Sequence, residues 1–456
     1  MGARQGAGST SPECVQHGRH EGLIVPNHGS QVRMSDKIGG IMKRLRPRVG
    51  DIIWSNLNTM IIAGSALVMS IVFVRSGAKD LYGHYLFVTA MVGLFSVVSI
   101  SGTKSVVFRT AAQGHDGVYR EATKLSFLWS LGGGVLLAAA GGLLWMFGRN
   151  VSGCNLLIAA LFFPFVTSLE NWMLLMKGRS DFSKLMWMNL TKLVIGLAAI
   201  SAAIVLTRSI IVILLAYFAV QSAFNIVYHM GCLRLLKNDL VDASWKKQSF
   251  ALTITELSSI AFGRVDILLV AALLPMESVA VYGLVMRLTG VFLALTKSTT
   301  EAVLPGIFKS DKITIRFFYK SVAASFVVPI MLSFVVKYPI VFMYGPESSE
   351  WAPYVRLYLF SIPLYYLYLL VSYFMIKHKL NREINYNSII GIIGVVILYV
   401  VLIPRYGIWG GVIASILFFV VATLSGLLLL SYSNKIIDLS HEEHESLGYT
   451  TLRHEV

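Results

Sequence analysis

Residues 406–432 read YGIWGGVIASILFFVVATLSGLLLLSY, a stretch without one charged side chain. An α-helix rises 1.5 Å per residue, so this stretch is long enough to cross a hydrocarbon core of roughly 30 Å. Continuous apolar runs of this length favour helices over the short alternating strands of a membrane barrel. The same pattern recurs upstream, and it predicts twelve spans at 51–74, 81–103, 125–147, 155–176, 185–206, 209–233, 250–274, 278–296, 317–343, 351–376, 387–404 and 408–432.

The composition of the whole chain agrees with this pattern. Of 456 residues, 55% are hydrophobic and 14% are charged, and the mean hydropathy is +0.68. An ordinary soluble domain carries roughly 25% charged residues. We therefore expect an all-α membrane protein of about twelve transmembrane helices.

The basic residues indicate an orientation. Of the 39 Lys and Arg, 29 lie in the N-terminal arm, in the loops after even-numbered spans and in the C-terminal tail. Cytoplasmic loops are enriched in Lys and Arg, so both termini are expected in the cytoplasm. Six cations lie in or beside the odd-numbered loops, namely Arg75, Lys79, Arg149, Arg208, Lys337 and Arg405, and four lie well within spans, namely Lys192, Arg264, Arg287 and Arg356. Lys320 and Lys337 fall near the two predicted ends of span 9 and are counted with the neighbouring loops.

Several function classes are disfavoured. The longest loops, 104–124 and 297–316, are too short for a nucleotide-binding or glycosyltransferase domain, and no GxxxxGK[ST] motif occurs. The net charge of +15 is spread among loops, so a nucleic-acid partner is not implied. Three cysteines show no ligand spacing, which argues against a disulfide framework or a metal site.

The predicted organisation has four parts. Residues 1–50 form a polar, largely disordered cytoplasmic arm, and 433–456 form a cytoplasmic tail. Between them lie an N-terminal six-helix lobe, 51–236, and a C-terminal six-helix lobe, 248–432. A faint duplication supports this division, because Tyr82-Gly83 opens span 2 and Tyr282-Gly283 opens span 8.

Three segments carry a family resemblance. Tyr82-Gly83-His84-Tyr85-Leu86-Phe87 is similar to the start of span 2 in polysaccharide-biosynthesis flippases, and residues 264–269, RVDILL, resemble their charged motif in span 7. Residues 406–414, YGIWGGVIA, closely match the start of their span 12. The turn at 278–283 departs from the pattern, because Ala280 stands where the family usually has Gly.

By these motifs the chain resembles the oligosaccharide-lipid flippases of the multidrug/oligosaccharidyl-lipid/polysaccharide exporter superfamily. The resemblance covers roughly 51–432 and implies two six-helix lobes around a central cavity that opens to each side in turn. It implies an undecaprenyl-diphosphate-linked oligosaccharide as substrate, carried to the outer leaflet of the cell inner membrane for O-antigen, capsule or exopolysaccharide assembly. Membrane lipids, a polysaccharide polymerase and glycosyltransferases are the partners implied. No cofactor is implied beyond a coupling ion, H⁺ or Na⁺.

Charged residues inside a bilayer are costly and are candidates for function. In the N-terminal half, Glu170 and Lys192 lie at similar depths in spans 4 and 5. They either form a buried pair, or Lys192 faces the cavity and binds a substrate phosphate, or Lys192 reaches the cytoplasmic surface.

In the C-terminal half, Asp266 and Arg287 fall at the same depth on adjacent helices, so we expect them to pair. Arg264 is then left without a partner, as suits a cavity that binds a diphosphate through a guanidinium group. Arg287 is the third candidate cavity cation. Asp266 and Glu170 are candidates for ion coupling or gating.

Two further groups of residues are singled out. Glu256 lies in a polar part of span 7, where it either lines the entrance and binds a coupling ion or bonds to neighbouring hydroxyls. Tyr366 and Tyr373, seven residues apart in span 10, either contact sugars or fill the helix interface. Pro329 and Pro363 predict kinks in spans 9 and 10.

The sequence therefore favours a flippase over two alternatives. A drug or metabolite cation antiporter of the same superfamily would need a cavity dominated by carboxylates, whereas this chain also offers Arg264 and Lys192. A membrane enzyme such as a polymerase would carry its acid and base residues on a large outer loop. The outer loops here are short, so no enzyme activity is expected.

Overall fold

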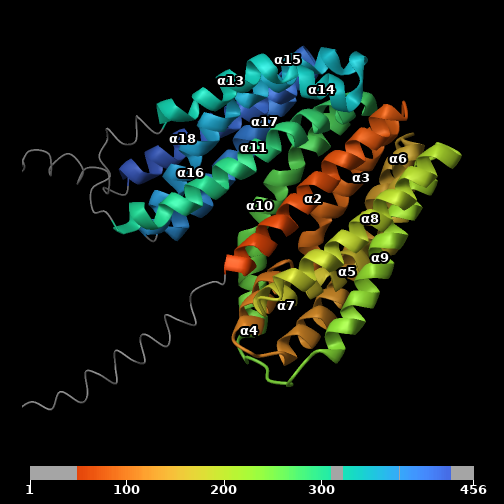
Figure 1. The fold of residues 1–456 in the computed structure, drawn as a ribbon, viewed down its shortest axis with the longest axis vertical. Helices are drawn as coiled ribbons and strands as arrows, with labels where there is room; N and C mark the ends of the chain where they lie inside the picture. Colours follow the sequence, from red (N-terminus) through yellow and green to blue (C-terminus); the bar gives the residue numbers. More distant parts are fainter. Residues whose placement is uncertain (1–48, 310–321, 379, 433–456) are drawn as a thin grey trace, which may run out of the picture. The chain divides into compact units, whose positions relative to one another are not determined.

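The computed structural model describes residues 49–309, 322–378 and 380–432. The predictions for 1–48 and 433–456 lie outside these residues. Ile53–Val456 form one compact unit, separate from Met1–Ile52, and the following description concerns the larger unit. Helices account for nearly all of the described chain, and none of the described residues forms a strand (Figure 1).

The N-terminal half contains eight α-helices and two short 3₁₀ segments. These are α2 (Val49–Arg75), α3 (Lys79–Phe95), η1 (Ser96–Ser99), α4 (Gly102–Ala112), α5 (Gly117–Met146), α6 (Asn150–Thr167), η2 (Leu169–Asn171), α7 (Trp172–Gly178), α8 (Phe182–Thr207) and α9 (Ile210–Arg234). Helix α5 packs along α6, and α9 contacts both α6 and α8. The buried apolar residues of these helices belong to one cluster that continues into the C-terminal half.

The C-terminal half repeats the long-helix plan. It contains α10 (Trp245–Leu273), α11 (Met276–Lys309), α13 (Val327–Val335), α14 (Lys337–Tyr344), η3 (Pro346–Trp351), α15 (Ala352–Leu359), α16 (Ser361–Lys377), α17 (Asn381–Tyr406) and α18 (Ile408–Tyr432). Helix α18 packs on α16 and α17, and α11 packs on α15 and α16. Across the halves, α3 contacts α10 and α11, and α4 contacts α10.

The predicted spans correspond to these helices. Among the described residues, ten helices are long and apolar enough to cross a membrane, and a bent pair, Val322–Val335 with Lys337–Tyr344, makes an eleventh. Helix α10 is long enough to be the twelfth, but it carries Glu256, Arg264 and Asp266.

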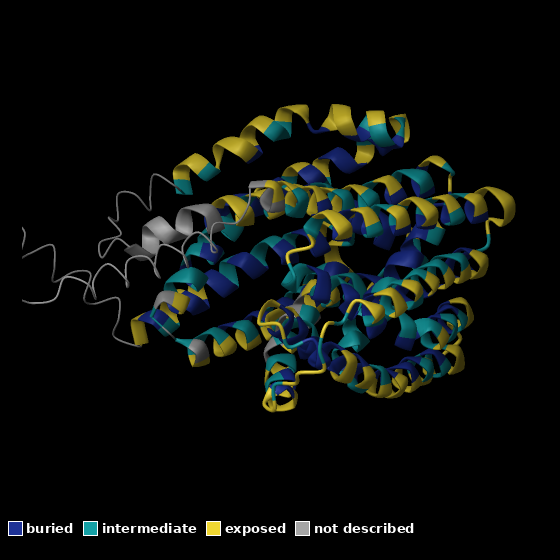
Figure 2. Ribbon diagram, turned by 60° about the horizontal axis from the view of Figure 1, so that its bottom comes forward, coloured by how far each residue is buried: buried dark blue, intermediate teal, exposed yellow. Residues whose placement is uncertain are grey.

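The surface of these helices suits lipid. Met146, Phe147 and Phe342 are 84%, 81% and 80% exposed, and many other large apolar side chains are exposed as well. Figure 2 shows exposed residues recurring along most of the helices. So many exposed large apolar side chains suit contact with lipid.

Prolines place the breaks in spans 9 and 10. Proline lacks a backbone N–H and its ring clashes with the carbonyl four residues earlier, so a helix breaks there. The helix before α13 ends at Ser325, four residues before Pro329, and α15 ends at Leu359, four before Pro363. Each of the two prolines thus follows an interruption of the helix, whereas the 52° bend in span 9 lies farther on, between Val335 and Lys337. Kinks at Pro329 and Pro363 themselves stay predictions.

The two ends of the bundle are named here by one residue each. The Arg149 end carries the turns at 76–78, 147–149, 274–275 and 407, and the Asp116 end carries 113–116, 179–181 and 235–244. At the Asp116 end, the segment 235–244 that joins the two halves is bonded to the N-terminal half. The Asp116 carboxylate accepts from the Arg179 guanidinium at 2.6 Å and from the Lys237 amide at 2.9 Å.

At the Arg149 end, the two Tyr-Gly pairs lie at one contact between α3 and α11. A Cβ on Gly83 would lie 1.9 Å from the Met276 carbonyl oxygen, and one on Gly283 would lie 2.3 Å from Leu86. Only glycine allows the helices to approach this closely. The duplicated motif therefore serves the packing of one half on the other.

Candidate functional site

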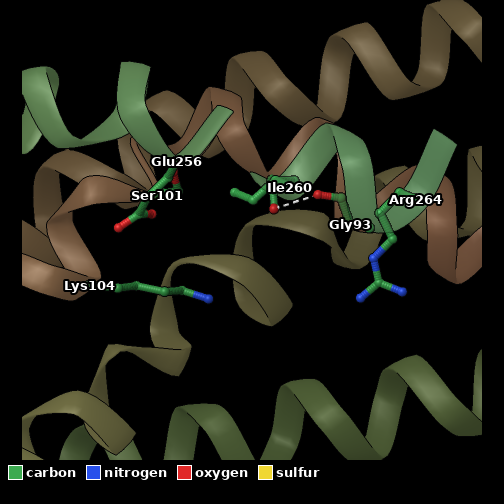
Figure 3. Close-up of a pocket in the computed structure, with 8 residues that line it drawn as sticks. Gly93, Ser101, Lys104, Glu256, Ile260 and Arg264 are labelled. Carbon is green, nitrogen blue, oxygen red and sulfur yellow. Dashed lines mark hydrogen bonds between the residues drawn. The ribbon is translucent and has the colours of Figure 1, made fainter. Parts of the chain in front are cut away.

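A cavity of about 600 Å³ lies between α4, the 93–101 segment and α10. Its wall contains two cations and one carboxylate, and the lining residues are Gly93, Ser96, Ser101, Lys104, Glu256, Ile260, Gly263 and Arg264. Figure 3 shows Lys104 and Arg264 extending toward the same space from different elements. Residues from both halves thus line one cavity.

The chain reaches this cavity through a break after α3. Ile100 has φ +56°, a left-handed conformation that a branched side chain rarely adopts, and it separates η1 from α4. The break redirects the chain, so that Lys104 on α4 lies on the cavity wall. The backbone amide of Gly102 then donates to Thr253 Oγ1 at 3.0 Å and fixes α4 against α10.

Arg264 is seated on a glycine of the opposite half. A Cβ on Gly93 would lie 2.6 Å from Arg264 Nε, so the missing side chain makes room for the guanidinium. Arg264 is exposed to the cavity rather than packed away from it. Among the described residues it forms no ion pair, so its donors are available to a ligand.

The other charged groups of the wall have partners. Lys104 Nζ donates to Glu170 Oε2 at 2.7 Å, and Ser105 Oγ donates to Glu256 Oε1 at 2.7 Å. Glu170 does not belong to the lining residues. The wall therefore presents a free guanidinium, an ammonium shared with a carboxylate, and a carboxylate bonded to a hydroxyl.

Lys192 is not on this wall. It is 6% exposed, and its Nζ donates to Asn225 Oδ1 at 3.0 Å. Asn225 also accepts from Trp172 Nε1 at 3.2 Å and donates to the carbonyls of Phe165 and Val166. Those carbonyls lose their helical donors at the break between α6 and α7, so Asn225 and Lys192 form the centre of a buried polar cluster.

The predicted pairing of Glu170 with Lys192 is wrong. Glu170 bonds to Lys104, which the sequence placed in a cytoplasmic loop, and Lys192 bonds to an amide. Lys192 remains close enough to Glu170 to interact electrostatically. The depth estimate was sound, but the break at Ile100 brings a nearer cation to the carboxylate.

The predicted pairing of Asp266 with Arg287 is also wrong. Arg287 Nη1 donates to the Ala66 carbonyl at 2.7 Å, and the guanidinium lies 5.4 Å from the centre of the Tyr82 ring. Asp266 Oδ2 accepts from the Tyr282 hydroxyl at 3.1 Å. Arg287 therefore interacts with a carbonyl and a ring face, and Asp266 with a hydroxyl, and the two charges do not pair with each other.

Asp266 lies beside a cluster of hydroxyl groups in the C-terminal half. The Tyr282 hydroxyl also bonds to Tyr399 at 2.8 Å and to Ser415 at 3.0 Å, and Tyr399 bonds to Ser415 at 2.7 Å. The second carboxylate oxygen, Asp266 Oδ1, has no hydrogen-bond partner in the described part of the chain. This oxygen is the free acceptor of the cluster.

The two tyrosines of α16 are placed away from the cavity wall. Tyr366 and Tyr373 are half-buried, and neither is a lining residue. A role for them in sugar contact stays a prediction. Within the described ranges, no group of three or more His, Cys, Asp or Glu residues could hold a metal ion.

Sequence reasoning found Arg264 and Glu256 but missed Lys104 and Gly93. Lys104 was counted among the loop cations because it follows a predicted span. A left-handed isoleucine carries no compositional signal, so the break that moves Lys104 was hidden. Gly93 offered only the faint signal of a glycine within a span.

The chain is similar to known proteins in its fold rather than in its sequence. No protein-family model and no curated protein sequence matches the chain. Solved structures do match. The lipid II flippase MurJ in an inward closed conformation shares 15% identity over 83% of this chain and 87% of its own, with a TM-score of 0.61.

Two further structures match at similar identity. A multidrug resistance MATE family transporter of the MOP superfamily, inward-facing, gives 13% identity, 84% and 99% coverage, and a TM-score of 0.59. A MOP superfamily transporter from Pyrococcus furiosus shares 14% identity over 84% of this chain and 95% of its own, with a TM-score of 0.55. The chain therefore shares the fold of these transporters. The prediction of twelve helices in two lobes is thereby confirmed.

Proposed function

We propose that this chain moves a lipid-linked anionic glycan across the membrane by alternating access. The observation that carries the proposal is the cavity lined from both halves, where Arg264 and Lys104 lie on one wall and Arg264 has no ion-pair partner among the described residues. A planar guanidinium binds two phosphate oxygens at once, and an ammonium adds a second charge. A diphosphate is the ligand group that fits this pair.

Within this proposal the substrate is an undecaprenyl-diphosphate-linked oligosaccharide. The chain would carry it from the cytoplasmic to the outer leaflet of the inner membrane, with both termini cytoplasmic. The fold shared with a lipid II flippase supports a lipid-linked substrate. A polymerase and glycosyltransferases would act after and before this step on cell-surface polysaccharide.

Arg264→Ala tests the proposal directly. We expect loss of surface glycan in cells that depend on this chain, with unchanged protein abundance in the membrane. Lys104→Ala is expected to weaken export, because its charge is shared with Glu170. Arg356→Ala is the matched control, since this exposed arginine of α15 is not a lining residue. Normal glycan export by the Arg264→Ala protein would refute the proposal.

A cation antiporter is the second candidate, because Glu256 lines the same cavity and the inward-facing structural neighbour is described as a multidrug resistance MATE family transporter. It predicts that Glu256→Gln abolishes efflux of cationic drugs while Arg264→Ala spares it. Glu256, Glu170 and Asp266 are also the carboxylates we propose for coupling to H⁺ or Na⁺. Glycan export that is unaffected by removal of both ion gradients would exclude that role.

A further inference from the structure

The Arg149 end of the bundle carries an unexplained set of cations. Three of the six basic residues that break the loop charge pattern, Arg75, Lys79 and Arg149, contact the opposite half. Lys79 Nζ lies 3.3 Å from Glu347 Oε2, an exposed pair of modest strength. The two arginines instead bond to backbone carbonyls at helix ends.

Arg75, the last residue of α2, bonds to the end of α14. Its Nε donates to the Met343 carbonyl at 2.8 Å, and its Nη2 donates to the Phe342 carbonyl. Phe342 lies four residues before Pro346, which has no backbone N–H to offer. The Phe342 carbonyl therefore lacks a helical donor, and the guanidinium supplies one.

Arg149, directly before α6, bonds in the same way to the end of α10. Its Nη2 donates to the Ala272 carbonyl at 3.0 Å, and its Nη1 lies 3.4 Å from the Ala271 carbonyl. Ala271 lies four residues before Pro275, so this carbonyl too has lost its helical donor. Carbonyls at a helix C-terminus carry partial negative charge, which favours a cation there.

We infer that Arg75 and Arg149 form a carbonyl latch that holds the Arg149 end closed. The latch comprises the two guanidinium groups with the carbonyls of Phe342, Met343, Ala271 and Ala272. Each arginine comes from one half, and each carbonyl pair comes from the other. Opening the cavity toward this end separates the halves, so all of these bonds must break. The inference rests on the alternating access of the proposed function, but it concerns the equilibrium between open and closed states rather than the substrate.

Carbonyl acceptors suit a contact that must open and close better than carboxylates do. Water replaces the lost partner of both a guanidinium and a carbonyl, so the open state leaves no buried unpaired charge. A bond from a charged donor contributes more than a neutral one, yet exposure to water reduces its strength. Such bonds stabilise the closed state without leaving an unpaired buried charge when it opens.

Accessibility of a cavity cysteine tests this inference without any substrate. The background replaces Cys14, Cys154 and Cys232 by Ser, and Ser96→Cys places one thiol on the cavity wall. A maleimide that cannot cross membranes is added to vesicles that expose either the Arg149 end or the Asp116 end. Labelling rates then report how often each end is open.

Combined Arg75→Gln and Arg149→Gln changes are expected to raise labelling from the Arg149 end about tenfold, and to lower labelling from the other end. Arg208→Gln is the matched control, because this exposed arginine lies at the same end and, within the described ranges, makes no hydrogen bond or ion pair with the opposite half. An unchanged rate in the double variant, or an equal rise in the Arg208→Gln protein, would overturn the latch.

A second variant covers the case in which the double variant does not accumulate. Arg75→Lys keeps the charge but cannot donate two parallel bonds, so we expect a rise of about threefold. No rise would count against the latch. Because labelling needs no glycan, a latch that fails here is distinguishable from a failure of the Arg264→Ala export test.

Discussion

Removing Asn225 should expose what Lys192 does. Asn225→Leu deletes the acceptor of Lys192 and Trp172 and the donor to Phe165 and Val166. Three of these bonds join uncharged groups and cost about 0.6 kcal/mol each inside a membrane protein. The bond from the charged Lys192 costs about 1.5–3 kcal/mol, so we expect a total of about 3–5 kcal/mol.

The assay is unfolding of purified protein in mixtures of detergent and SDS, followed by tryptophan fluorescence. Adding Lys192→Met to Asn225→Leu removes the unpaired ammonium, so the double variant should recover part of the lost free energy of unfolding. Asn238→Leu is a control for an asparagine at the exposed Asp116 end, where water replaces the lost partners. A loss below about 1 kcal/mol, or no recovery in the double variant, would refute the buried-cluster role of Lys192. If the double variant recovers stability but not glycan export, the result would favour the alternative in which Lys192 binds a substrate phosphate.

Two other predictions concern packing and pH. Gly83→Ala should lower the free energy of unfolding by about 1–3 kcal/mol, because its Cβ would overlap the Met276 carbonyl at the contact of α3 with α11. Gly77→Ala in the nearby turn is the control, because a Cβ there causes backbone strain without overlap. Equal losses in the two variants would contradict the packing argument. Burial raises the pKa of Asp116, but hydrogen bonds from Arg179 and the Lys237 amide outweigh it, so the pKa lies below its ordinary value. A carboxyl group with a lowered pKa stabilises the fold at pH values above its pKa in the unfolded chain, about 3.9. This contribution is lost as the pH falls through the lower pKa of the folded state. Thermal unfolding between pH 3 and 7 should show this acid-dependent loss in the natural protein and a smaller one in Asp116→Asn, whereas Asp239→Asn, at an exposed pair, should leave it unchanged.

The long helices were predictable because their signal is local. The last span, predicted at 408–432, is the helix Ile408–Tyr432, and the sixth, predicted at 209–233, is Ile210–Arg234. Apolar length decides such elements whatever lies around them. Helix ends were less predictable. Span 2 was predicted to end at 103 but α3 ends at Phe95, and span 8 was predicted to end at 296 but α11 continues to Lys309.

The candidate site was only half predictable. Arg264 and Glu256 are charges inside an apolar run, and a charged group in contact with lipid is costly in free energy. Their presence on the cavity wall could therefore be inferred from the sequence. Which group meets which charge could not be inferred. Asp266 bonds to a tyrosine hydroxyl and Arg287 to a carbonyl, and neither partner differs in sequence from an ordinary core residue.

The contact of α3 with α11 has a consequence for how such a chain can arise. Gly83 meets the start of α11, and Gly283 meets α3, so each half offers the other the same kind of surface. In a twofold homodimer, too, one surface patch faces its own copy across the interface. A single ancestral lobe that paired with its own copy would already possess this seam, and fusion would then free each copy to change alone. The confinement of Arg264 to one half and of Lys104 to the other is what such freedom allows.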